Sequence, residues 1–437
     1  MDNRDSFSGK FGVIAAAAGS AVGLGNIWRF PYVLGENGGG AFFLIYLFFI
    51  VAIGIPVMLS ELIIGRRSQK SIFGALKVLS PNVRFFRIVG VMGVAAAFLI
   101  LSFYSVVAGW TVEYTVLAFG NQLADKTPGQ LSALFQGFST SLWRPVFYLV
   151  VFMLLTAGIV MGGVKKGIER YAKILMPVLL LIIVILCIKS SSLKGAGDGL
   201  AFLFQPDFTK ITGNVVLEAL GQAFFSLSIG MGAIATYGSY VQKKENLLHT
   251  AVSVSLVDTL IAVLAGVAIF PAVFAFGIQP DAGPGLVFVT LPNIFNQMAG
   301  GYFFSAAFFV LLLIAALTSS VSLLEVVVAY FTDELRLSRK PATILGAFLM
   351  IILGVFCVIY PKLFNAFEWT SSNLLLPLGG ILISIFIGWF LGKDQVKEEL
   401  EAHGGKVAVL NVFMIIVKVL APVAVALVFM NNLGLLR

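Results

Sequence analysis

Long apolar runs alternate with short charged or Gly/Pro-rich breaks along most of the chain. A membrane-spanning helix needs about 20 mostly apolar residues, and eleven runs come close to or exceed that length. They are residues 11–35, 41–64, 87–119, 145–163, 172–189, 214–240, 247–276, 301–334, 341–360, 367–392 and 406–431. The pattern predicts an all-α integral membrane protein of about eleven transmembrane helices, with a single domain over residues 1–437.

Two of the predicted helices are interrupted by glycine. The segment GSAVGLGN at 19–26 interrupts the first helix, and SLSIGMG at 226–232 interrupts the sixth. Gly costs about 1 kcal/mol relative to Ala inside a helix, although membrane helices also use it for close packing. The two segments open consecutive sets of five helices, and interruptions at matching positions indicate a transporter site. Freed carbonyls there can bind a cation, and half-helix N-termini can receive a carboxylate.

Polar residues inside the predicted helices also indicate a functional interior. The run ALTSSVSLLEV places Thr318 and Ser319 in mid-helix. Their hydroxyls either bond back to their own helix or complete an oxygen cage for a cation. Four acidic residues lie within or near helices, where a charge is costly unless it is paired or hydrated: Glu61, Glu113, Asp258 and Glu325. Asp258 is the strongest candidate, because its own helix contains no basic residue.

Composition and charge narrow the class of protein. Of the 437 residues, 59% are hydrophobic and 11% are charged, whereas soluble domains are about 45–50% apolar and about 25% charged. Lipid must therefore be the solvent. The net charge of +8 does not indicate a nucleic-acid partner, because the basic residues lie in short loops. Cys187 and Cys357 lie inside apolar segments, so neither a disulfide nor a metal site is expected. The polar stretch 1–10 shows no cleavable signal peptide.

The distribution of Lys and Arg predicts the orientation. With the N-terminus in the cytoplasm, twenty basic residues fall in cytoplasmic segments and seven in external ones, which agrees with the positive-inside rule. An odd number of helices then places the C-terminus outside. Two external loops, 190–213 and 277–300, are longer than a simple connection needs. Such loops either cover a site or gate access to it, or they are passive connections.

Four motifs carry a family resemblance that extends over nearly the whole chain. They are GSAVGLGNIWRFPY at 19–32, ENGGGAF at 36–42, GQAFFSLSIGMG at 221–232 and LTSSVSLLE at 317–325. With them the chain resembles the neurotransmitter:sodium symporters, especially their bacterial eleven-helix amino-acid transporters. The resemblance implies two inverted five-helix repeats, with helices 1 and 6 broken. These repeats would span about 7–190 and 214–392, followed by an extra helix at about 406–431.

The function implied by the resemblance is sodium-coupled import of amino acids by alternating access. The ligands would be an amino acid and two sodium ions, without an organic cofactor. The surroundings would be the lipid bilayer of a prokaryotic plasma membrane, since the tails are short and the predicted helices number about eleven.

The resemblance also implies particular site residues. The first sodium site would use the Ala21 carbonyl, Asn26, Ser226, Asp258 and the substrate carboxylate. The second would use the carbonyls of Gly19, Val22 and Ala315 with the hydroxyls of Thr318 and Ser319. The substrate would contact Ala21, Leu24, Gly25, Ile100, Tyr104, Phe225, Ser226, Ser228, Met231, Ser319 and Leu323. An outer gate would pair Arg29 with Glu368 above Tyr104 and Phe225, and an inner gate would pair Arg4 with Asp333 near Phe7 and Tyr240.

One departure from the family pattern concerns chloride. Chloride-dependent animal members carry Ser where this chain has Ala262, although Tyr46, Gln222 and Ser226 match other chloride-site positions. We hypothesise that Asp258 supplies the missing negative charge, so that transport is chloride-independent. The same carboxylate would gain a proton after sodium leaves, giving proton antiport.

A second departure concerns the substrate. Met231 lies between two glycines where some relatives that prefer aliphatic amino acids carry Phe. Methionine is flexible and fills irregular gaps, so it would leave room for a larger side chain. We therefore expect aromatic or large hydrophobic L-amino acids, such as tyrosine or tryptophan.

Other classes of function fit the sequence less well. An intramembrane hydrolase needs a base beside a buried nucleophile, but His249 lies at a helix start and His403 in a loop, so an enzyme is not expected. A channel usually shows a filter of repeated subunits or rings of charge, whereas matching broken helices favour a carrier. A sensor that binds without transport stays an alternative, which counterflow of labelled substrate in liposomes would distinguish.

Overall fold

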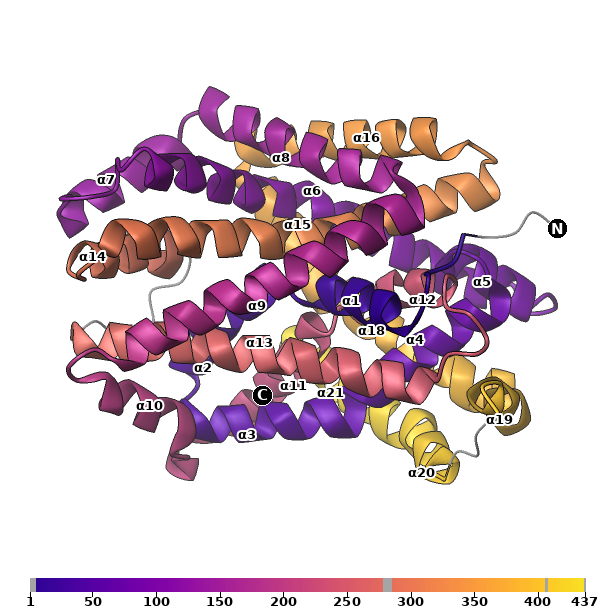
Figure 1. The fold of residues 1–437 in the computed structure, drawn as a ribbon. Coiled ribbons are helices and arrows are strands. Elements are labelled where there is room, and N and C mark those ends of the chain that lie inside the picture. The colour runs from indigo at the N-terminus through magenta and orange to yellow at the C-terminus, as the bar shows by residue number, and fades with distance from the viewer. Residues whose placement is uncertain (1–4, 278–284, 405–407, 436–437) are drawn as a thin grey trace.

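The computed structural model describes residues 5–277, 285–404 and 408–435. These residues form a bundle of helices that lie roughly along one direction (Figure 1). Short helices cap the two ends. At one end lie the N-terminal segment, α5 (Ile72–Leu79) and α19 (Gly392–Glu401). At the other end lie α7 (Pro128–Ser139), α10 (Ala196–Phe204) and α14 (Leu291–Asn296).

Nine helical segments in the described part of the chain are long and apolar enough to cross a membrane. Five are single helices or nearly so: α6 (Phe86–Phe119), α8 (Trp143–Met161), α13 (Leu247–Ala275), α15 (Gly301–Glu334) and α16 (Arg339–Ile359). Four contain π-helical turns: α3–η2–α4 (Gly40–Phe49, Ile50–Gly54, Ile55–Ser68), η3–α9 (Val164–Glu169, Arg170–Ser191), α17–η6–α18–η7–α19 (Pro361–Trp369, Thr370–Leu375, Leu376–Ile385, Phe386–Leu391, Gly392–Glu401) and α20–η8–α21 (Leu410–Ile415, Ile416–Leu420, Ala421–Asn432).

Two further segments are broken, at the predicted positions. The first consists of α1 (Lys10–Ala21) followed by η1 (Gly25–Arg29) and α2 (Phe30–Glu36), and the two halves are bent by 54°. The sixth consists of α11 (Gly213–Ser226) and α12 (Ala233–Gly238). Between these helices the chain is unwound, and Ser228, Gly230 and Gly232 have φ of 54°, 89° and 74°. The prediction of an all-helical membrane bundle with broken helices 1 and 6 is confirmed, whereas the boundaries of the two repeats stay predictions.

Several boundaries differ from the predicted ones. The fifth segment begins at Val164, not at 172, and the tenth covers Pro361–Glu401, not 367–392. In both cases the helix continues through charged residues beyond its apolar run, which hydropathy alone does not reveal. The long loops are also partly helical, since 190–213 contains α10 and 277–300 contains η5 (Leu286–Thr290) and α14.

The buried fraction of each membrane-spanning segment shows how close the segment lies to the centre of the bundle. In α15, 78% of the most apolar window is buried within the protein, against 33% in the η3–α9 and α20–α21 segments. Helix α15 is therefore central, and the other two segments present most of their surface to lipid. The hydroxyl-bearing stretch around Thr318 lies in this central helix, which places it away from the hydrocarbon.

The end of the bundle near the N-terminus contains a buried ion pair. Arg66, at the end of α4, donates from Nε to Glu399 of α19 at 2.6 Å, and the two side chains are 0% and 3% exposed. The same guanidinium donates to the carbonyls of Glu245 (2.6 Å) and Glu399. The adjacent Arg67 pairs with Glu398 at 3.1 Å, where the Glu398 side chain is 69% exposed. Arg66 thus joins α19 to α4 and to the segment before α13.

This junction predicts unequal effects of two neighbouring substitutions. Glu399→Ala leaves the buried guanidinium of Arg66 without its counter-charge, which should cost about 3–5 kcal/mol. Glu398→Ala removes only a solvated pair, so it should cost less than about 1 kcal/mol. Thermal unfolding of both purified variants in detergent compares them, and equal losses would contradict the structural role of Glu399.

Candidate functional site

The unwound part of the sixth segment is stabilised by one buried carboxylate. Glu61 of α4 is 0% exposed and accepts hydrogen bonds from the backbone N–H groups of Gly230 (2.6 Å) and Ala235 (3.1 Å). Backbone groups that lose their helical partners inside a membrane must be satisfied within the protein. Glu61 meets this requirement and fixes both edges of the break.

A cavity of about 40 Å³ lies between the two breaks. Its lining includes ten of the eleven predicted substrate contacts: Ala21, Leu24, Gly25, Ile100, Tyr104, Phe225, Ser228, Met231, Ser319 and Leu323. Ser226, the eleventh, does not line this cavity and instead bonds to Asn26 and Asp258. The cavity is also lined by Ser20, Gly23, Ser322 and Leu376, which were not among the predicted substrate contacts.

Polar groups in this cavity belong to the broken helices, α6 and α15. The hydroxyl of Tyr104 accepts from the backbone N–H of Leu24 at 3.4 Å, at the break in the first segment. Ser228 donates to the Ser20 carbonyl at 3.1 Å, which links the two breaks directly. Helices α6 and α15 supply both polar and apolar lining, with Tyr104 beside Ile100 on α6 and Ser319 and Ser322 beside Leu323 on α15.

The residues predicted for the first sodium site form one buried cluster. Asn26 Nδ2 donates to Asp258 Oδ1 (2.7 Å) and to Ser226 Oγ (3.1 Å), and Ser226 Oγ donates to Asp258 Oδ2 (2.7 Å). Their side chains are 0–1% exposed. The N–H of Gly23 donates to Asn26 Oδ1 at 3.0 Å, so the amide turns its nitrogen toward the carboxylate. In this orientation Asn26 Oδ1, the atom predicted to bind sodium, accepts the N–H of Gly23.

The residues predicted for the second sodium site form a cluster of oxygen atoms. The Val22 carbonyl accepts from Thr318 Oγ1 (3.3 Å) and Ser319 Oγ (3.0 Å). Thr318 Oγ1 also donates to the Ala315 carbonyl at 3.1 Å, and a methyl group on Gly19 would lie 3.4 Å from Thr318 Cβ. Hard cations prefer oxygen ligands of this kind. Thr318 thus bonds both to its own helix and to the first break, whereas Ser319 bonds to carbonyls of the first segment. That these hydroxyls bind a cation stays a prediction.

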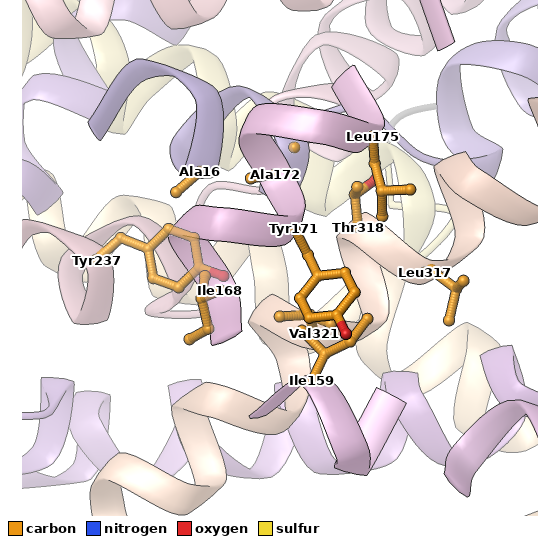
Figure 2. A pocket seen from close by; sticks show the side chains of 11 residues that line it. Ala16, Ile159, Ile168, Tyr171, Ala172, Leu175, Tyr237, Leu317, Thr318 and Val321 are labelled. Carbon is orange, nitrogen blue, oxygen red and sulfur yellow. The ribbon is translucent and has the colours of Figure 1, made fainter. Parts of the chain in front are cut away.

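A small cavity borders the second cluster. Figure 2 shows Thr318, Tyr171 and Tyr237 around it, together with apolar residues of α1, α8, η3, α9 and α15. Its volume of about 10 Å³ corresponds to roughly one water molecule. The oxygen cluster is thus closely packed on this side as well.

A larger cavity lies toward the α7 end of the bundle. It has a volume of about 360 Å³, and its lining includes Arg29, Tyr104, Phe225 and Glu368. Tyr104 and Phe225 also line the central cavity, so these two side chains separate the two spaces. The guanidinium carbon of Arg29 lies 4.2 Å from the Phe225 ring centroid. No ion pair joins Arg29 to Glu368 among the described residues, so the outer gate pair stays a prediction for a different conformation.

Aromatic residues close the opposite side of the central region. Phe7 is 1% exposed and packs edge-on against Tyr237 and Tyr240, each at 5.9 Å between ring centroids. Its N–H donates to the Tyr240 carbonyl at 3.0 Å. Asp333 accepts from the Ser71 N–H at 2.6 Å. Its predicted partner Arg4 lies outside the described residues, so that pair also stays a prediction.

Comparison with known proteins identifies the family. The model of the sodium:neurotransmitter symporter family matches residues 4–133 and 129–436. An uncharacterized sodium-dependent transporter of Bacillus subtilis is 40% identical, and the match covers 98% of each chain. One of Haemophilus influenzae is 37% identical, again over 98% of each chain. The chain belongs to the sodium:neurotransmitter symporter family.

A solved structure agrees with this assignment. The crystal structure of MhsT in complex with L-phenylalanine superposes with a TM-score of 0.91 at 45% identity, covering 98% of this chain and 100% of that one. The protein is therefore a multi-pass, sodium-dependent symporter and not an enzyme. His249 bonds with Ser253 and His403 bonds with Asn246, and neither histidine lines the central cavity.

Two acidic residues gain structural roles in the symporter that sequence reasoning left open. Glu61 holds the sixth break, as described above. Glu325 accepts from Tyr240 Oη (2.6 Å) and from both terminal nitrogens of Arg339 (2.6 and 3.1 Å). It therefore positions the tyrosine that packs against Phe7. The signal in both cases was a carboxylate inside an apolar helix, but its partners come from other segments.

Among the positions that correspond to the chloride site of other family members, one buried side chain, that of Gln222, has no hydrogen-bond partner in the described part of the chain. Tyr46 Oη donates to Ser226 Oγ at 3.2 Å. Gln222 lies one turn before Ser226 on α11, and its two amide atoms are buried without a partner in the described part of the chain. Ala262 is fully buried at 0% exposure and adds no polar group. The carboxyl group of this region is that of Asp258, which accepts from Ser226; its role in place of chloride stays a prediction.

The sixth break predicts the effect of adding one methyl group. Gly230 has φ of 89°, and a Cβ atom there would overlap the Leu376 carbonyl oxygen. We expect Gly230→Ala to lose more than about 2 kcal/mol of stability and to lose ligand binding. Gly221→Ala is the control, because the nearest atom to its Cβ, on Val428, lies at 3.7 Å. Thermal unfolding and binding assays compare the two, and equal behaviour would contradict the constraint at Gly230.

Proposed function

We propose that this symporter imports aromatic or large hydrophobic L-amino acids together with two sodium ions, by alternating access. The observation that carries the proposal is the contact between the central cavity and both polar clusters. Ser319 belongs to the cavity lining and to the second cluster. Gly25 and Phe225 line the cavity, and each directly precedes a member of the first cluster.

This arrangement supplies a physical basis for coupling. A bound amino acid would place its carboxylate at the first break, beside the oxygens of Asn26, Ser226 and Asp258. It would then complete the coordination of the first sodium ion, while Ser228 and nearby carbonyls receive the ammonium. Because each ligand contributes to the binding of the other, sodium and amino acid would bind cooperatively.

Two observations support the hydrophobic substrate class. The cavity is lined by the apolar side chains of Ile100 on α6, Leu323 on α15 and Met231 at the sixth break. MhsT, with 45% identity over nearly the whole chain, was crystallised with L-phenylalanine. An apolar pocket with few fixed polar groups is typical of a site for such a ligand.

The two sides of the central cavity differ as alternating access requires. A cavity of about 360 Å³ adjoins it on the α7 side, while Phe7 and its tyrosine partners pack on the side of the N-terminus. We take the α7 side as external and both the N-terminus and α19 as cytoplasmic, in agreement with the distribution of Lys and Arg. Transport inward would require Arg29 to leave Phe225 for Glu368, and Phe7 to leave Tyr240.

Uptake into proteoliposomes tests the proposed function. With an imposed inward sodium gradient, labelled phenylalanine, tyrosine or tryptophan should accumulate more than leucine, and a matched potassium gradient should give no accumulation. Leucine that competes better than every aromatic amino acid would contradict the substrate class. Binding without accumulation under any gradient would identify a sensor instead.

Paired variants in the same assay test the second sodium site. Thr318→Val keeps the shape of the side chain but removes a predicted ligand, so half-maximal uptake should need roughly tenfold more sodium. Ser320→Ala is the control, because its hydroxyl lies 2.8 Å from Thr156 Oγ1 and donates to Leu317. A sodium requirement that is unchanged in Thr318→Val would exclude this threonine as a ligand.

Replacing chloride tests the role of Asp258. If Asp258, which accepts from Ser226, supplies the negative charge of this region, sodium-driven uptake should be unchanged when gluconate replaces chloride. Asp258→Asn should lose most uptake in both anions, and it should remove any dependence of uptake on internal pH. Uptake by the wild type that collapses in gluconate would overturn the hypothesis.

A further inference from the structure

A second cavity lies directly beside the central one. It has a volume of about 70 Å³ and lies between α11, the tenth segment and α21, where its lining includes Gly221, Asn373 and Val428. Two side chains, Phe225 and Leu376, line both this cavity and the central one. These two side chains therefore form the wall between the two spaces. We call the second space the side cavity.

Phe225 and Leu376 are not equivalent members of that wall. Phe225 also lines the large outer cavity and contacts the guanidinium of Arg29 at 4.2 Å, so it takes part in closing the site. Leu376 is 3% exposed and lines only the central and side cavities among the three. Its side chain can change the shape of the central cavity without altering the lid.

The backbone of Leu376 is held against the sixth break. Its carbonyl oxygen lies so close to Gly230 that no Cβ could fit there, and the Gly230 carbonyl lies equally close to Gly379. The break thus packs backbone to backbone against the first turn of α18. Leu376 begins this helix, directly after the π-helical turn η6. The position of the residue is therefore fixed, and only its side chain is free to rearrange.

Volume shows why the side cavity matters for substrate choice. A water molecule needs about 10–15 Å³ on this measure, so the central cavity of about 40 Å³ holds roughly three waters. An aromatic amino acid has many more atoms than three waters, so some lining side chain must move to admit it. Moving Leu376 would add about 70 Å³ beside the break, in a space that borders the outer cavity at Arg29 and Phe225.

We propose that Leu376 is a specificity-determining residue, whose side chain sets the largest amino-acid side chain that the central cavity accepts. This inference rests on the proposed amino-acid transport and extends it. Substrates with a large ring would displace Leu376 toward the side cavity. Aliphatic substrates would leave it in place.

Competition against labelled phenylalanine in purified protein gives the ratio of affinities for tryptophan and leucine. Leu376→Ala joins the two cavities, so the ratio should shift roughly tenfold toward tryptophan. Leu376→Phe fills the side cavity, so the ratio should shift toward leucine by a similar factor. The opposite directions distinguish a specificity role from general damage, and Leu376→Phe carries the test if Leu376→Ala does not fold.

Leu391→Ala is the matched control, because this leucine is 4% exposed in the same segment and lines neither cavity. It should lower stability and leave the ratio unchanged. A ratio that stays constant in both Leu376 variants, in protein that still binds phenylalanine, would overturn this inference alone. Wild-type protein that binds and accumulates no amino acid would overturn the proposed function, and this inference with it.

Discussion

The structure depends on one constraint: backbone groups that leave a helix inside a membrane need partners within the protein. Here a single carboxylate, Glu61, supplies two such partners to the sixth segment. Both breaks must therefore lie where other helices surround them. That requirement brings α15, with its hydroxyls, and α6, with Tyr104, against the same few residues. The central cavity and the two polar clusters are consequences of satisfying the broken helices away from lipid.

Much of this arrangement could be predicted from the sequence, because its signals are local. Glycines around Asn26 and Met231 mark the breaks, and hydroxyls or carboxylates in apolar helices mark the interior. The family resemblance then supplied residues from distant segments, and ten of the eleven predicted substrate contacts line one cavity. Leu376 could not be predicted, because a leucine in an apolar helix looks the same whether it faces lipid or a cavity. The orientation of the Asn26 amide was equally hidden, since it depends on the N–H of Gly23.

The two ends of the bundle are held by different forces. On the side of the N-terminus, two ion pairs, Arg66 with Glu399 and Arg339 with Glu325, join four segments of the bundle near packed aromatic rings. On the α7 side, Arg144 pairs with the buried Glu113, whereas Arg29 lies over the ring of Phe225 and has no carboxylate within ion-pair distance in the described residues. Contacts of charge with an aromatic face are weaker than buried ion pairs. The contact of Arg29 with Phe225 is therefore easier to break than these ion pairs.

The orientation of Asn26 has a consequence for the order of events. Its amide nitrogen directs the positive end of a dipole at Asp258, much as a small cation would. When the oxygen turns toward an incoming ion, the N–H of Gly23 loses its acceptor. That donor then lies at the broken helix, beside the cavity that would receive a carboxylate. Arrival of the ion would thus free a hydrogen-bond donor for the carboxylate that follows. The rotation of one side chain would then determine the order in which the two ligands bind.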